Sequence, residues 1–267
     1  MFRIGLCYPM SWDVGEVRGH LARLRKFGYE GIEFWPVSLD KMDIAELADI
    51  LQDTGVACAQ ICPYFDFVHG QEKWDETLRI AERYVSWSLQ LGKPLIRVFT
   101  GPGVGPAEAT VEQWEAAFRG LQRVCDMAAP HGIRLALECH GGSLMADSPG
   151  ALRLLAGVGR PNLGVNPQLP LKDGHETIDT TIEQLGHVTW HMHTHNYTAL
   201  VGGHLLPLAE GVLDYGETLP RLMAKGFDGY VSIEHANHEG RRDPWEIAEI
   251  EGAYLTKLRE ELSRRNQ

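Results

Sequence analysis

Four short segments of the chain combine apolar residues with acidic or imidazole side chains. They are residues 31–35 (GIEFW), 135–140 (LALECH), 191–196 (HMHTHN) and 231–234 (VSIE). Carboxylates and imidazoles transfer protons as general acids and bases, and both are common ligands of divalent cations. Glu138 and Glu234 are the candidates for catalysis, because each follows a run of apolar residues typical of a buried strand.

The alternation of side chains along a strand divides each segment into two faces. Glu138 and His140 share one face, and Glu234 lies on the face opposite Val231 and Ile233. An ionised carboxylate that faces the protein interior is costly unless it is paired or bound to a metal. A divalent cation between the two glutamates removes this cost, and a salt bridge, for example with Arg97, is the structural alternative.

The histidines at alternate positions of residues 191–196 share one face, and one of them is predicted to be a metal ligand. His191 fits a buried, hydrogen-bonded core histidine, and His195 fits a solvated loop residue. A salt bridge is an equal alternative to a functional role for Glu33. Four aromatic residues that follow strands are candidate walls for a small polyol, with loop packing as the alternative: Trp12, Trp35, Tyr64 and Phe65.

Eight apolar runs that alternate with eight amphipathic stretches must position these residues. The expected strands are 2–7, 31–34, 56–61, 95–99, 133–138, 163–166, 188–193 and 230–234, and the expected helices are 14–27, 41–54, 72–91, 110–130, 149–158, 175–186, 215–225 and 244–263. This alternation predicts an α/β fold, a (β/α)8 TIM barrel, with its active site at the carboxyl ends of the strands. Because no Gly-, Ser- or Pro-rich linker interrupts the pattern, residues 1–267 are predicted to form a single domain.

Local signals favour the barrel over an open, doubly wound sheet. Such a sheet needs a glycine-rich phosphate turn after an early strand, and residues 7–12 (CYPMSW) contain none. Asp147 followed by Ser148 and Pro149 is typical of a helix start, and Gly226 is typical of a helix end.

Composition excludes several classes of function. The 267 residues carry a formal net charge of −11, which argues against nucleic acid as a partner. No apolar run approaches the roughly 20 residues needed to cross a membrane, and the first residues do not form a signal peptide. Five cysteines without a CxxC pair indicate a reduced, cytoplasmic protein. Association into a homo-oligomer is left open.

Several of these segments resemble one known family. Residues 28–33 (GYEGIE), 135–140 (LALECH), 206–211 (LPLAEG), Asp214 and residues 225–234 (KGFDGYVSIE) are similar to the sugar phosphate isomerase/epimerase family. Its members are xylose isomerase-like TIM barrels related to ketose 3-epimerases, hydroxypyruvate isomerase and inosose dehydratase. The resemblance implies a small sugar or polyol substrate, but it does not single out one reaction, since one fold hosts many.

The resemblance also implies one divalent metal ion, manganese above all, with magnesium, cobalt and zinc as alternatives. The family ligands correspond here to Glu138, Gln168, His193 and Glu234. Gln168 replaces the family's aspartate, so it can offer a carbonyl oxygen but no charge. We therefore expect a weaker metal affinity and a stronger Lewis acid. His195 and Asn196 stand where the family often has lysine and aspartate.

The leading hypothesis is a metal-dependent isomerase or epimerase in which Glu138 and Glu234 remove and return a proton next to a carbonyl. A dehydratase or another lyase that acts on a keto-polyol is the second hypothesis. A catalytically silent sugar-binding barrel is the third, and the net charge disfavours a related endonuclease. The candidates for substrate binding are Glu33, Trp35, His140, His195 and Asn196.

Overall fold

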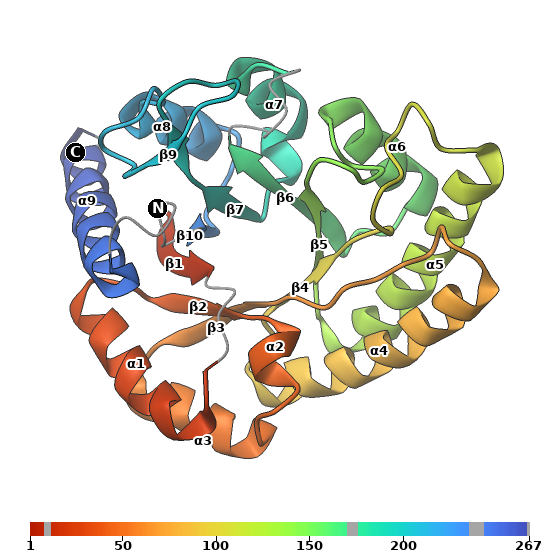
Figure 1. Cartoon of the computed structure of the whole chain (residues 1–267), viewed down its shortest axis with the longest axis horizontal. Coiled ribbons are helices and arrows are strands. Elements are labelled where there is room, and N and C mark those ends of the chain that lie inside the picture. Colours follow the sequence, from red (N-terminus) through yellow and green to blue (C-terminus); the bar gives the residue numbers. More distant parts are fainter. Residues whose placement is uncertain (8–11, 170–175, 235–242, 266–267) are drawn as a thin grey trace.

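Eight parallel strands close into a barrel at the centre of the molecule (Figure 1). The computed structural model describes residues 1–7, 12–169, 176–234 and 243–265. The strands are β1 (Arg3–Cys7), β2 (Gly31–Phe34), β3 (Ala57–Ile61), β4 (Leu95–Val98), β5 (Leu135–Cys139), β6 (Leu163–Leu169), β7 (His191–Thr194) and β10 (Tyr230–Glu234). Each pairs with its neighbours in the chain order of the eight, and β10 closes the ring against β1. The predicted TIM barrel is confirmed.

Helices surround the barrel on its outside (Figure 1). They are α1 (Val14–Lys26), α2 (Pro36–Leu39), α3 (Ile44–Thr54), α4 (Gln71–Gln90), α5 (Val111–Ala128), α6 (Ser148–Val158), α7 (Ile178–Leu185), α8 (Tyr215–Ala224) and α9 (Pro244–Arg265). Short 3-10 turns follow α5 (Ala129–His131) and α7 (Gly186–Val188). Within the described residues, no helix combines the length and the apolar character needed to cross a membrane.

The predicted helix ends have the expected local chemistry. Asp147 precedes α6, and its side chain accepts a hydrogen bond from the backbone N–H of Gly150 at 2.7 Å. Pro149 lies in the first turn, where a missing N–H costs nothing. Gly226 follows α8 with a φ of +99°, a conformation that glycine adopts without strain.

The strand bounds agree with expectation to within two residues except in β6 and β7. Strand β7 begins at His191 and not at Val188, because Gly186–Val188 form a 3-10 turn. The sequence places the end of β6 before Pro167, but the structure continues it to Leu169. The proline lacks only its own N–H, and the paired backbone of β5 and β7 holds the remaining residues. Helix α2 and the two-stranded hairpin of β8 (Asn196–Tyr197) and β9 (Leu205–Leu206) were not predicted, because such short elements carry no readable periodicity.

The two faces of the strands differ in chemistry. Leu135, Leu137, Val231 and Ile233 are buried in the hydrophobic core, as the alternation predicts. The opposite faces fill the barrel with fully buried polar side chains, among them Gln60, Arg97, Asn166, Gln168, His191, His193 and Ser232. Buried polar groups need hydrogen-bond partners, so these side chains form a network that fixes the site above them.

Candidate active site

A cavity of about 770 Å³ opens at the carboxyl ends of the strands. Glu138 from β5 and Glu234 from β10 both line it, and their side chains are only 1% and 5% exposed. Trp35 and His140, two of the residues expected to bind substrate, also line this cavity. The structure therefore brings both predicted catalytic carboxylates to one cavity, with an aromatic ring and an imidazole beside them.

Arg97, at the end of β4, forms a buried ion pair with Glu138. Its Nη1 lies 2.8 Å from Glu138 Oε2, and its Nη2 donates to the carbonyl of Cys62 at 2.9 Å. Although burial opposes ionisation, Arg97 and His193 hold the pKa of Glu138 below its usual range. The salt bridge considered from the sequence is confirmed for Glu138. Three rings surround the guanidinium at 4.6–4.8 Å: Trp35, Tyr64 and Phe99.

His193, from β7, lies below the two glutamates and contacts a third. Its Nδ1 is 3.0 Å from Glu138 Oε1 and 3.8 Å from Glu234 Oε2, while its Nε2 is 3.0 Å from Glu33 Oε2. Burial disfavours the imidazolium, but the neighbouring carboxylates, Glu33 first, raise the pKa of His193 well above its usual value. Without a metal, His193 is therefore a cation that bridges carboxylates.

His191 lies one layer deeper, as a core histidine would. Its Nε2 is 2.7 Å from Glu33 Oε1 and 3.0 Å from the hydroxyl of Ser232. Burial lowers the pKa of His191, so this ring is neutral at neutral pH. Glu33 is 1% exposed and paired with both His191 and His193. It lies below the cavity, so its expected contact with substrate stays a prediction that this position does not favour.

Gln168 completes a ring of four polar atoms. Its Nε2 lies 3.2 Å from Glu138 Oε1 and 3.0 Å from Glu234 Oε2. The Nδ1 of His193 contacts the same two oxygen atoms and closes the ring. Ligands about 2.1 Å from a divalent ion are separated from one another by about 3 Å. A half-turn of the Gln168 amide would place its oxygen toward the ring centre. The four predicted ligands therefore fit a divalent cation.

Glu33 supplies a second feature of a metal site. A histidine that binds a metal through one ring nitrogen usually donates the other N–H to a carboxylate, which fixes the ring. Glu33 accepts a hydrogen bond from Nε2 of His193, and the Nδ1 of the same ring faces Glu138 and Glu234. Sequence reasoning missed this role of Glu33, although its position on the inner face of β2 could have indicated it.

Cys7 is a further buried residue that offers a cation ligand near this group. Among the described residues, two buried trios offer ligand atoms within 4.8 Å of one another: Cys7 with His193 and Glu234, and Glu33 with His191 and His193. Both trios leave out Glu138. Cys7 is not among the residues that the sequence predicted for the site.

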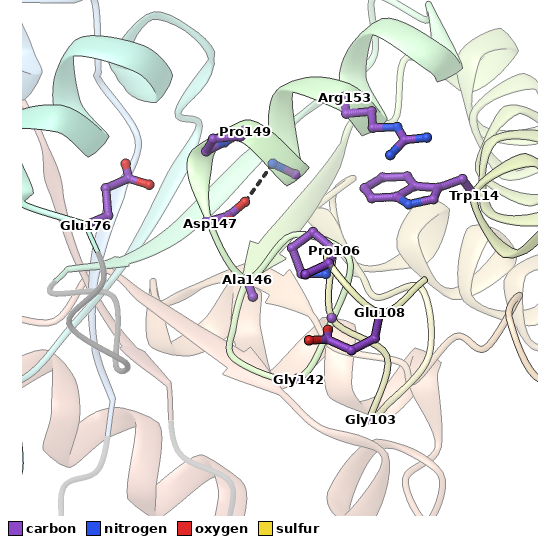
Figure 2. Close-up of a pocket in the computed structure, with 13 residues that line it drawn as sticks. Gly103, Pro106, Glu108, Trp114, Gly142, Ala146, Asp147, Pro149, Arg153 and Glu176 are labelled. Carbon is purple, nitrogen blue, oxygen red and sulfur yellow. Dashed lines mark hydrogen bonds between the residues drawn. The ribbon is translucent and has the colours of Figure 1, made fainter. Parts of the chain in front are cut away.

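A second cavity, of about 790 Å³, adjoins the first, and Gly103 and Gly142 line both (Figure 2). Figure 2 shows Asp147 at the start of α6, where its carboxylate is bound to the backbone of Gly150. This carboxylate therefore holds a helix end. No residue predicted for the site lines the second cavity, which makes the first cavity the candidate active site.

Comparison with known proteins identifies the family of this barrel. A family model described as xylose isomerase-like TIM barrel matches residues 21–258, which is most of the chain. The chain belongs to the xylose isomerase-like TIM barrel family. The resemblance inferred from the sequence is thereby confirmed.

Similar proteins within this fold differ in their reactions. The 3-dehydroshikimate dehydratase of Bacillus anthracis is 23% identical over 238 residues, which cover 80% of this chain and 83% of the relative. An L-ribulose 3-epimerase superposes with a TM-score of 0.83 at 19% identity, covering 100% of this chain and 97% of that one. A xylose isomerase-like TIM barrel protein from Mycobacterium smegmatis, in complex with magnesium, gives a TM-score of 0.74 at 18% identity, with coverages of 92% and 89%.

In this xylose isomerase-like barrel, the last two candidate substrate-binding residues, His195 and Asn196, have different surroundings. His195 lies beside one of the two candidate catalytic glutamates, with its Nδ1 3.6 Å from Glu234 Oε2. Asn196 is fully buried, and its amide binds the backbone of Leu208 and Leu213. It therefore holds the loop after β9, and its contact with substrate stays a prediction that this geometry does not favour.

The aromatic residues expected to form walls divide into two groups. Trp35, Tyr64 and Phe65 line the candidate cavity. Trp12 instead stacks on Trp245, with ring centroids 6.4 Å apart, in agreement with the loop-packing alternative. Phe99, which the sequence analysis did not single out, also lines the cavity and stacks parallel to Tyr64.

Proposed function

We propose that this chain is a divalent-metal-dependent isomerase or epimerase that abstracts a proton next to the carbonyl of a small sugar or keto-polyol. The observation that carries the proposal is the pair of nearly buried carboxylates, Glu138 and Glu234, on the floor of one cavity. Both contact the same amide of Gln168 from different strands. Two bases placed in this way can exchange a proton with two sides of one carbon.

The metal would be held by Glu138, Gln168, His193 and Glu234, the four residues of the ring. When bound, a divalent cation polarises the substrate carbonyl and makes the adjacent C–H bond more acidic. Manganese is the expected ion under this proposal, and the magnesium complex of the Mycobacterium smegmatis protein supports a divalent cation in this fold.

The remaining residues of the cavity suit a polyhydroxylated substrate. Arg97 keeps Glu138 ionised and thus able to accept a proton. Trp35 and Tyr64 offer apolar surface for the C–H faces of a sugar, and His140 and His195 offer ring nitrogens for its hydroxyls. The Nδ1 of His140 is already bound to the backbone carbonyl of Gly141 at 2.8 Å, so its Nε2 is the atom left for substrate.

The second candidate function is a dehydratase, and the curated relative favours it. The Bacillus anthracis protein named 3-dehydroshikimate dehydratase matches across most of both chains. The same proton abstraction by Glu138 or Glu234 leads to dehydration when a β-hydroxyl leaves. Elimination produces a conjugated product that absorbs in the ultraviolet, whereas isomerisation does not.

A substrate screen in heavy water tests the proposal. The purified protein, loaded with manganese, would be incubated with sugars, keto-polyols and their phosphates, and proton NMR would follow each. We expect deuterium at the carbon next to the carbonyl together with a new isomer, and chelation should stop both. Loss of substrate with a conjugated product would select the dehydratase. Absence of exchange across the panel, with metal bound, would support the silent sugar-binding barrel.

A further inference from the structure

Cys7 lies inside the barrel at the level of the candidate catalytic residue Glu234. It ends β1, where its backbone pairs in register with Glu234 of β10 and with Glu33 of β2. Its side chain is fully buried, yet it lies outside the hydrophobic cluster that contains Cys58, Cys125 and Cys139. The thiol of Cys7 therefore faces the polar interior and not the apolar layer under the helices.

The thiol converges with two of the proposed metal ligands. Ligand atoms of Cys7, His193 and Glu234 all lie within 4.8 Å of one another, and all three residues are buried. Tetrahedral zinc sites commonly combine cysteine, histidine and carboxylate ligands, with Zn–S distances of about 2.3 Å. Small side-chain movements would bring the three atoms to such distances.

The charges of the proposed metal ligands allow a further anionic ligand to bind the ion. Glu138 is already neutralised by Arg97 at 2.8 Å, and Gln168 carries no charge. A thiolate at Cys7 together with Glu234 would balance a divalent cation, as the aspartate missing at position 168 would otherwise do.

We propose that Cys7 is a metal ligand of this site and that it shifts the preference of the site from manganese or magnesium toward zinc. The inference rests on the proposed function, because it concerns the same ion. Thiolates are soft ligands that favour zinc and cobalt, whereas magnesium and manganese prefer oxygen. Binding converts the thiol to the thiolate and releases one proton to solvent.

Cobalt substitution tests the ligand directly. The full chain would be loaded with Co²⁺, and the near-ultraviolet band of thiolate-to-cobalt charge transfer would be recorded. We expect the band in the unmodified protein and in Cys62→Ser, and its loss in Cys7→Ser. Cys62 is the matched control, because its thiol is also buried and lies 3.5 Å from Glu33 Oε2 but belongs to neither trio. The ratio of zinc to manganese affinity should fall at least roughly tenfold in Cys7→Ser.

X-ray absorption of the zinc-loaded, unmodified protein needs no variant and should show sulfur at about 2.3 Å. Metal bound through nitrogen and oxygen alone, with no charge-transfer band, would overturn the role of Cys7 and leave the proposed function intact. Failure to bind any divalent metal would overturn both.

Discussion

At the scale of single residues, carboxylates outnumber cations around the candidate metal site within the described part of the chain. Glu33, Glu138 and Glu234 there contact Arg97 and the protonated His193. The pKa of Glu33 lies well below its usual value because the two histidines outweigh the effect of burial. A divalent cation that replaces the proton on His193 Nδ1 would add one positive charge to this group of carboxylates.

Arg97 should control the pH at which Glu138 works. Replacement of Arg97 by Met removes the cation that favours the carboxylate, so the pKa of Glu138 should rise. Since the base acts only when ionised, activity should then be lost at a higher pH as the solution is acidified, by roughly one pH unit. The pH profile of kcat/KM checks this shift. Arg97→Lys keeps the charge and should move the acid limb less; equal shifts in both variants would contradict the argument.

Gln168→Asp should tighten metal binding, because it adds a charge beside Glu138 and Glu234. Without metal, the same change should lower stability, since three carboxylates would then lie close together. Calorimetric titration with manganese and urea unfolding of the metal-free protein measure the two effects. An unchanged or weaker affinity would mean that Gln168 does not contact the ion.

At the scale of elements, the alternation of strand residues determined most of what could be predicted. It correctly separated Leu135 and Leu137 from Glu138, and it placed both catalytic candidates in one cavity. Contacts between distant strands, such as that of Glu33 with His193, depend on how the closed barrel aligns β2 with β7, and one sequence carries no signal of that alignment. The structural role of Asn196 was missed for a related reason: the hairpin that it supports is too short to show periodicity.

The layers of strand β7 predict three different variant phenotypes. Inward residues of one strand lie about 6–7 Å apart, so His191, His193 and His195 cannot all bind one ion. His193→Ala should lose metal and activity together, and His195→Ala should lose activity while it retains metal. His191→Ala should mainly destabilise the fold, by about 3 kcal/mol, because Glu33 loses a buried partner. Metal content and unfolding curves separate these cases; metal loss in His195→Ala alone would mean that the layer assignment is shifted by two residues.

At the scale of the whole molecule, metal binding should stabilise the barrel. The ring of ligands joins β5, β6, β7 and β10, so an ion there links strands across the interior. Metal at 100 times its Kd adds about 2.7 kcal/mol to the free energy of unfolding, which corresponds to roughly 5 °C in Tm for a chain of this size. Chelation should lower Tm by this amount, and readdition of metal should restore it. An equal fall in Tm when metal is chelated from the Glu234→Gln variant would mean that the ion binds elsewhere.

Under the proposed function, two carboxylates from different strands transfer the proton. The most direct test measures turnover and deuterium exchange by Glu138→Gln and Glu234→Gln, with saturating metal and with metal content determined. The matched control is Glu183→Gln, because Glu183 is an exposed glutamate paired with Lys225 on the outer helices. We expect each catalytic variant to fold and to fall below roughly one-tenth of the unmodified rate, a loss expected for removal of a general base, while Glu183→Gln keeps full activity. Either catalytic variant above one-tenth of that rate would contradict the two-carboxylate mechanism.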